Sequence, residues 1–244
     1  MNLRRPIGIV LTVATLAGAT VASAELANGS IDPTANPPVP GPSGFAAKID
    51  NPWFPLIPGT TLVYRGTVDG KPIRDVLTVT DETAVIDGVR CTVLRDRLYL
   101  QGRLEERTTD WYAQDKRGTV WYFGEATALL DENGRVKSTE GSWRAGRNGA
   151  QAGIFMPADP KVGDSFRQEY YKGHAEDQFR VLSLGARVTV PYIASSRALL
   201  TKEQTPLEPG VVDHKYYVRG IGTVLEQTIR GGTERLELVA VRRP

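Results

Sequence analysis

Short runs of alternating apolar and polar residues recur along most of the chain, from residue 51 to residue 242. The clearest runs span residues 61–65, 76–80, 179–184, 187–190 and 236–241. A period of two puts neighbouring side chains on opposite faces of a β-strand, whereas an amphipathic helix needs a period near 3.6 residues. No window of helix length shows the longer period. The pattern therefore predicts an all-β fold.

Dipeptides that favour tight hairpins separate these runs. They accept the positive φ angles that two-residue hairpin turns require. They occur at Asp69-Gly70, Asp87-Gly88, Asn133-Gly134 and Gly231-Gly232. Such hairpins join strands in sequential antiparallel order. We therefore expect a curved, mostly antiparallel sheet or an incomplete barrel, built by residues 51–244 as a single β domain.

An internal repeat is suggested by two pairs of turn motifs with the same spacing. Gly59 and Gly163 each precede a strand-like run and lie 104 residues apart. Gly118 and Gly222 each open a Gly-Thr-Val segment after an aromatic pair, and they also lie 104 residues apart. Two independent anchors at one offset predict two pseudo-repeats, at about residues 51–154 and 155–242.

The first 24 residues predict a signal peptide. Arg4 and Arg5 precede nineteen uncharged residues, and small residues occupy positions 22–24 before Glu25. This order of a basic start, an apolar run and a small-residue cleavage site is typical of secretion signals. An uncleaved anchor is the alternative, since about 18 apolar residues can cross a bilayer. We expect cleavage before Glu25 and a secreted or cell-envelope protein, periplasmic or extracellular, with no membrane span.

Composition limits the partners and the length of the folded part. Residues 25–50 are rich in Pro with scattered Gly, Ser and Asn, which predicts a disordered tether because such a segment buries little apolar surface. Without Arg4 and Arg5 the chain has 28 basic and 28 acidic residues. Its charge therefore gives no reason to expect nucleic acid or an anionic membrane as a partner.

Three stretches resemble a family pattern. They read DWYAQDKRGTVWYFGE at residues 110–125, VTVPY at 188–192 and KYYVRGIGTV at 215–224. Together they resemble a group of exported bacterial β proteins of unknown function, over roughly residues 51 to 242. The resemblance implies a curved antiparallel sheet similar to those of lipoprotein carriers, and it supplies no catalytic residues. A Gly usually follows the Val-Pro segment in that group, whereas Tyr192 stands there in this chain.

Residues 110–125 contain two aromatic pairs and predict a hairpin. The first strand ends with Trp111-Tyr112, residues 115–118 turn, and the second strand begins near Trp121-Tyr122. Because neighbours on a strand point to opposite faces, we expect one member of each pair in the core and the other facing outward. Those outward aromatics, together with Trp143, are the candidate platform for a sugar or apolar ligand. The alternative is a hairpin stabilised by cross-strand aromatic contacts.

Other candidate groups are sparse. A metal site would need His174 and Glu176 on one face of a strand, with a third ligand such as His214. Surface or structural histidines are the preferred interpretation. Cys91, the only cysteine, excludes an intrachain disulfide and is expected to be a small buried residue, with a reactive thiol or an intermolecular bridge as the alternatives. Residues 131–134 lack the ligand spacing of an EF-hand and are read as a hairpin turn.

Carboxylates suggest a hydrolase as a third possibility. A glycosidase needs two carboxyl groups about 5–10 Å apart, and the sequence cannot place any such pair. The plentiful acids include Asp110, Asp115, Glu125, Glu140 and Glu169. No catalytic residue, metal or cofactor is assigned.

Two main hypotheses for the function remain. The first is an exported, non-catalytic binding or carrier protein, monomeric, whose concave face holds a small apolar or amphipathic ligand. The second is a structural or interaction module of the cell envelope with a filled core. The packing of the concave face would distinguish them.

Overall fold

The computed structural model describes residues 36–244, which form β-strands and one short 3-10 turn, η1 (Pro42–Gly44). The predicted signal peptide and residues 25–35 of the predicted tether lie outside the described residues. The strands before residue 157 are β1 (Thr61–Val68), β2 (Lys71–Ile86), β3 (Val89–Leu100), β4 (Arg103–Gln114), β5 (Val120–Leu130), β6 (Val136–Ser138), β7 (Trp143–Arg144) and β8 (Gln151–Met156). The later strands are β9 (Ser165–Arg167), β10 (Glu169–Tyr170), β11 (Gln178–Thr189), β12 (Ala194–Gln204), β13 (Val212–Val218), β14 (Gly222–Arg230) and β15 (Arg235–Arg242). No helix among residues 36–244 has the length and hydropathy needed to cross a membrane.

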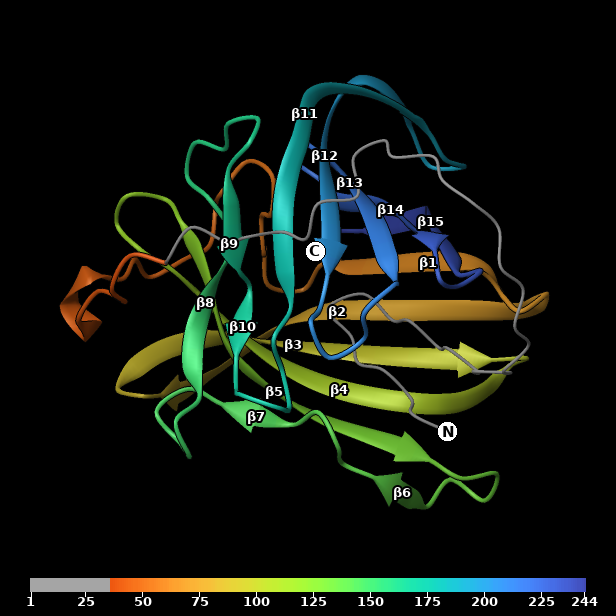
Figure 1. Cartoon of the computed structure of the whole chain (residues 1–244), viewed down its shortest axis with the longest axis horizontal. Helices are drawn as coiled ribbons and strands as arrows, with labels where there is room; N and C mark the ends of the chain where they lie inside the picture. The colour runs from red at the N-terminus through yellow and green to blue at the C-terminus, as the bar shows by residue number, and fades with distance from the viewer. Residues whose placement is uncertain (1–35) are drawn as a thin grey trace.

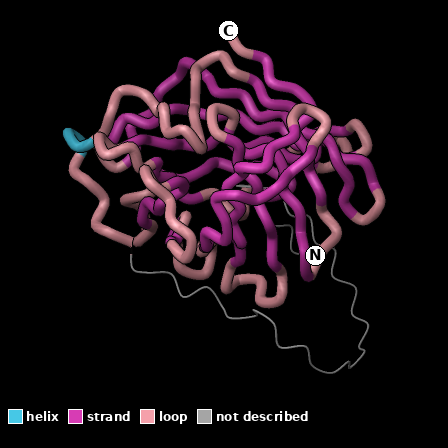
Figure 2. The backbone as a smooth tube through the Cα atoms, turned by 90° about the horizontal axis from the view of Figure 1, so that it is seen from above, coloured by secondary structure: helices cyan, strands magenta, loops and turns pink. Residues whose placement is uncertain are grey.

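The strands form one antiparallel sheet, so the predicted fold class is confirmed. Its order is β10-β8-β5-β4-β3-β2-β1-β15-β14-β13-β12-β11-β9, and β6 and β7 both pair with β5. The sheet curls over, so that β11 to β13 run at a steep angle to the nearly horizontal β1 to β4 in Figure 1. Figure 2 shows the same strands from above, where they wrap round a common interior.

The two edges of the sheet meet in one short segment. Strand β9 pairs with β11 at one edge, β10 pairs with β8 at the other, and Gln168 alone separates β9 from β10. Gly153 on β8 permits this meeting, because a Cβ there would overlap the carbonyl oxygens of Arg167 and Gln168. The sheet is therefore nearly closed and barrel-like.

Residues 45–58 cover one end of the barrel. Phe45 packs edge-on against Phe123 of β5, with ring centroids 5.5 Å apart, and the backbone N–H of Ala46 donates to the carbonyl of Gln114 at 2.8 Å. Farther along, Phe54 is buried against Tyr112. The domain boundaries stay a prediction, but packing against the β body begins before residue 51.

The internal repeat also stays a prediction, with some local features in its favour. The N–H of Gly59 donates to Val79 O at 2.8 Å, and the N–H of Gly163 donates to Val181 O at 2.9 Å. Both glycines have positive φ, 84° and 97°. Shifted by 104 residues, the bounds of β3 fall at residues 193–204, close to those of β12.

Candidate functional site

The hairpin predicted for residues 110–125 is confirmed. Strand β4 ends at Gln114, and β5 begins at Val120. Asp115 organises the turn, because its Oδ1 accepts hydrogen bonds from the N–H groups of Arg117 at 2.9 Å and Thr119 at 3.1 Å. Its Oδ2 accepts the indole N–H of Trp121 at 3.1 Å. A buried carboxylate thus fixes both the turn and the first aromatic of the next strand.

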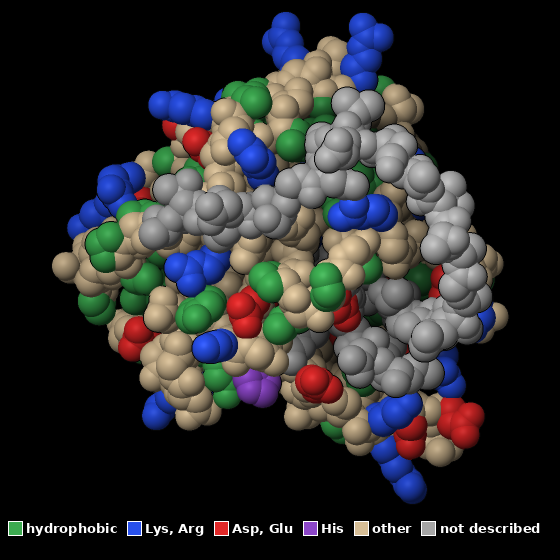
Figure 3. Space-filling view, in the orientation of Figure 1, with side chains coloured by type: hydrophobic (Ala, Val, Ile, Leu, Met, Phe, Trp, Pro, Cys, Tyr) green, Lys and Arg blue, Asp and Glu red, His purple; other side chains and the backbone are tan. Residues whose placement is uncertain are grey.

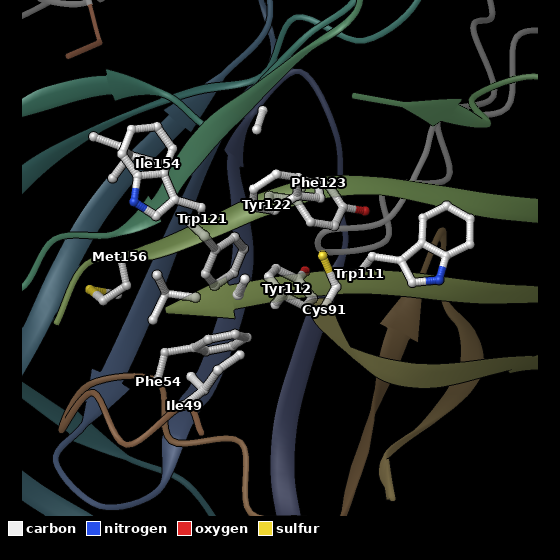
Figure 4. Close-up of a cluster of buried hydrophobic side chains, with 14 of the residues drawn as sticks. Ile49, Phe54, Cys91, Trp111, Tyr112, Trp121, Tyr122, Phe123, Ile154 and Met156 are labelled. Atoms are coloured by element: carbon white, nitrogen blue, oxygen red, sulfur yellow. The ribbon is translucent and has the colours of Figure 1, made fainter. Parts of the chain in front are cut away.

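The two aromatic pairs are entirely buried. Trp111, Tyr112, Trp121, Tyr122 and the nearby Trp143 are each at most 6% exposed. Tyr112 and Tyr122 stack across the hairpin with ring centroids 4.6 Å apart, and Trp143 packs edge-on against Tyr122 at 5.3 Å. The ring of Trp111 points away from the other labelled side chains in Figure 4.

The outward members of these pairs are covered, which differs from the expected exposed platform. The guanidinium of Arg144 lies 4.4 Å from the ring centroid of Trp111. Residues 45–58 pack over the other end of the hairpin, where Phe45 contacts Phe123. Local alternation could not reveal this cover, because it comes from segments distant in sequence. A ligand-binding role for the five aromatics stays a prediction.

Polar side chains form a belt on the inner face of the barrel. The belt's carboxylates come from five strands. Its first half consists of Asp75 on β2, Asp96 on β3 and Asp110 on β4, and its second half contains Glu203 on β12 and Glu226 on β14. All five are buried. Alternation sets their direction, since residues two apart on a strand share one face.

Tyr64 on β1 lies between the two halves of the belt in the order of the sheet. Burial raises the pKa of its phenol well above the ordinary value, and the charges of Asp75, Asp96 and Glu226 raise it further. These carboxylates come from β2, β3 and β14. The hydroxyl of Tyr64 donates to Thr223 O at 2.9 Å, so the phenol is anchored to β14, the strand that carries Glu226.

The second half of the belt contains its own cation. Lys215 on β13 is the only buried Lys or Arg among residues 36–244. Its Nζ lies 2.7 Å from Glu203 Oε2 and 3.7 Å from Glu226 Oε1. Burial alone would lower the pKa of Lys215, but the two carboxylates outweigh it and hold that pKa well above its ordinary value. Glu203 Oε1 also accepts hydrogen bonds from Thr201 Oγ1 at 2.9 Å and the Tyr217 hydroxyl at 3.2 Å.

The first half of the belt contains carboxyl groups that lie close enough to raise one another's pKa. Asp75 and Asp96 are diagonal neighbours on β2 and β3, since Asp75 pairs with Leu98 and Asp96 with Leu77. Burial raises the pKa of Asp75 well above its ordinary value, and the neighbouring Asp96 adds to the shift. Burial likewise raises the pKa of Asp96. Oδ1 of each carboxyl group has no hydrogen-bond partner in the described part of the chain.

Asp110 belongs to the same half and has one donor. The hydroxyl of Tyr122 donates to Asp110 Oδ1 at 2.8 Å. Burial raises the pKa of Asp110 well above its ordinary value, and the charge of Asp96 raises it further. Its direct cross-strand partner is Glu125, so two of the carboxylates noted from the sequence do lie side by side.

Apolar side chains flank the belt in two clusters. One cluster contains the stacked tyrosines, with Phe54, Val79 and Phe155. The other contains Leu98, Leu236, Leu238 and further aliphatic residues. Leu77, between Asp75 and Val79 on the inner face of β2, packs against both clusters. The interior is therefore amphipathic, with charge in the middle and hydrocarbon on either side.

The histidine candidates do not share a strand face. His174 lies in the turn after β10, stacked on Tyr171 at 4.3 Å, and Glu176 Oε1 accepts the N–H of Gly173 at 2.6 Å. Residues 171–175 form a tight turn, so His174 and Glu176 lack the shared strand face that the metal-site alternative needed. Within residues 36–244, no three His, Cys, Asp or Glu side chains are arranged to hold a metal ion.

The remaining candidates have structural explanations. Asp131 Oδ1 accepts the N–H groups of Asn133 and Arg135, at 2.9 Å and 2.8 Å, which confirms a hairpin turn. Cys91 is fully buried on β3, as expected, and burial raises the pKa of its thiol to about 12. Glu140 is exposed, whereas Glu169 is buried beside the closure of the barrel. Lys and Arg side chains are spread over the face shown in Figure 3 rather than gathered in one patch.

Comparisons with known proteins do not assign this chain to a family. No protein-family model matches the chain, and no curated protein matches it. One solved structure with some likeness is that of a "putative lipoprotein" from Parabacteroides distasonis. It has 10% sequence identity and a TM-score of 0.42, over 78% of this chain and 98% of that one. A similarity at this level does not show a shared fold or a shared function.

Sequence reasoning missed most of the belt. It noted Asp110 and Glu125 among many acids, but not Asp75, Asp96 or Lys215. A signal was present on β2, where Ile73, Asp75, Leu77 and Val79 occupy alternate positions. A single acid within an otherwise apolar inward series marks a buried charge.

Proposed function

We propose that the protein is an exported, non-catalytic binding protein that holds a small amphipathic ligand inside the curve of its sheet. The observation that carries the proposal is the amphipathic interior, in which a belt of buried carboxylates lies between two apolar clusters. A purely structural domain gains more from an apolar core, because burying charged groups is costly. Ligand sites are typically apolar walls with a few oriented polar groups.

A second function, a structural module of the envelope with a filled core, is favoured by a different observation. At one end of the barrel the stacked Tyr112 and Tyr122 pack against Phe54 and Phe155. These rings pack against one another, so this end of the barrel is filled by the protein's own side chains. The ligand site is therefore proposed for the belt rather than for the aromatic end.

Thermal unfolding with single-chain amphiphiles tests the binding proposal. The protein recovered after export would be heated with dodecanol, dodecanoate, dodecylamine or dodecyl maltoside below their micellar concentrations. A ligand that binds the folded state raises Tm as its concentration rises. We expect a saturable rise with at least one of these compounds. No rise with any of them would contradict the proposal and favour the structural module.

Export is tested separately. N-terminal sequencing of the secreted protein should find Glu25 as its first residue, because cleavage is proposed after Ala24. Recovery of the full chain with Met1 or Asn2 at its start, in the membrane fraction, would contradict this assignment.

A further inference from the structure

The Asp75–Asp96 pair carries an inference that rests on the proposed function and narrows the ligand class. Asp75 is 6% exposed and Asp96 is 9% exposed, so each is more than nine-tenths buried. They occupy the inner face of β2 and β3 as diagonal neighbours. Oδ1 of each carboxyl group lacks a hydrogen-bond partner in the described part of the chain. Two adjacent buried acids with open acceptor atoms require a proton or a cation nearby.

The described side chains do not supply that cation. Lys215, the buried lysine of the belt, lies between Glu203 and Glu226. Arg97 is next to Asp96 in sequence, but its Nη1 donates to the backbone carbonyl of Asp96 at 2.7 Å and to Thr108 O at 3.5 Å. Neither cation is placed on the open carboxylate oxygens of the pair.

The surroundings favour an organic ammonium over a metal ion. Calcium and magnesium need about six or more oxygen ligands, and no three acidic or imidazole side chains in residues 36–244 are suitably grouped. A primary ammonium has three donors and no acceptor, which suits two carboxylates and one further oxygen. The phenol of Tyr64, the cross-strand partner of Asp75, supplies an oxygen nearby.

Apolar side chains border the pair on both strands. Leu98 is the direct partner of Asp75, and Leu77 is the direct partner of Asp96. Leu98 belongs to one apolar cluster, while Leu77 contacts both. An alkyl chain attached to the ammonium would therefore remain in contact with hydrocarbon. We propose that Asp75 and Asp96 form the recognition site for the primary ammonium group of an amphiphilic ligand.

Binding of four dodecyl compounds to the protein recovered after export tests this site. Isothermal titration would compare dodecylamine, dodecyltrimethylammonium, dodecanol and dodecanoate below their micellar concentrations. We expect dodecylamine to bind at least tenfold more tightly than the others. The trimethyl compound keeps the charge but has no N–H donor, so it separates hydrogen bonding from simple charge attraction.

Isosteric variants locate the effect. Asp75→Asn and Asp96→Asn should each weaken dodecylamine binding at least tenfold and leave dodecanol binding unchanged. Asp81→Asn is the matched control, because Asp81 lies on the same strand and is exposed. Urea midpoints identify any variant that does not fold, in which case the other variant carries the test.

The outcomes separate the two proposals. Dodecanol binding as tightly as dodecylamine, or unchanged amine affinity in both Asn variants, overturns the ammonium site and leaves a general amphiphile-binding protein. Binding of none of the four compounds, together with no rise in Tm with dodecyl maltoside, contradicts the proposed function, and the ammonium site with it.

Discussion

The two halves of the interior belt both contain buried carboxyl groups, but only the second half pairs them with a buried cation. On β12 to β14, Glu203 and Glu226 share Lys215, and Glu203 has two hydroxyl donors besides. On β2 and β3, Asp75 and Asp96 lie together with an open oxygen each. The first arrangement is completed within the protein, whereas the second is completed by a proton or a ligand. A charge-compensated cluster stabilises one side of the barrel, and an uncompensated one on the other side is suited to recognition.

Removing the lysine should produce the largest effect. Lys215→Met leaves Glu203 and Glu226 buried without their cation, and loss of one partner of a buried ion pair costs about 3–5 kcal/mol. Urea unfolding should show this loss in the midpoint. Lys137→Met, at an exposed position on β6, is the control and should change little.

A second substitution checks the cause. Adding Glu203→Gln to Lys215→Met should recover part of the lost stability, because one of the stranded charges is then absent. A loss below about 1 kcal/mol for Lys215→Met would mean that the two halves do not differ in charge compensation.

Removing the hydroxyl of Tyr122 or of Tyr217 should lower stability by less than removing Lys215, and by unequal amounts. Tyr122→Phe removes the donor to Asp110 Oδ1, and leaving a buried acceptor unsatisfied costs about 1–3 kcal/mol. Tyr217→Phe should cost less than about 1 kcal/mol, because Glu203 keeps Lys215 and Thr201 as donors. Urea midpoints of the two variants make the comparison. Equal losses would show that Asp110 has a replacement donor.

The acid pair predicts a gain of stability instead of a loss. The folded-state pKa values of Asp75 and Asp96 are raised above the ordinary value of 3.8. Between about pH 4 and the raised values the folded protein binds more protons than the unfolded chain, so stability falls as pH rises. Asp75→Asn should therefore be more stable than the parent at pH 7, because the variant has no carboxyl group to ionise at this buried position.

The pH profile of that difference is the decisive measurement. Urea unfolding from pH 4 to pH 7 should show the advantage of Asp75→Asn shrinking toward pH 4. The groups that act on Asp75 are Asp96 and Glu226, and both remain in the variant. His214, whose pKa is lowered by burial and by Lys202, acts oppositely below pH 6.5 but equally in both proteins. An advantage independent of pH would contradict the assignment.

The fold could be predicted from the sequence because strands and hairpin turns are specified by short stretches of residues. Alternation identified the strands, and the hairpin at residues 110–125 followed from two aromatic runs separated by Asp115 to Gly118. The belt also depends on contacts between strands far apart in sequence, such as Tyr64 on β1 with Thr223 on β14. Reading every polar residue as outward-facing also fails at Asp75, where an acid occupies an inward position. The cover over Trp111 and Phe123 likewise comes from distant segments.

The smallest effect concerns the proposed repeat that relates the two halves. Gly59 and Gly163 each have positive φ and make corresponding backbone hydrogen bonds, to Val79 O and Val181 O. A side chain at such φ is strained, so Gly59→Ala and Gly163→Ala should each cost about 1 kcal/mol in urea unfolding. Gly59→Ala should cost slightly more, because its Cβ would lie 3.1 Å from Pro244, whereas nothing lies within 4 Å at Gly163. Gly185→Ala is the control, since its φ is not positive and the space beside it is open. If only one of the two turn variants loses stability, the turns are not equivalent, and the 104-residue offset is then a coincidence of sequence.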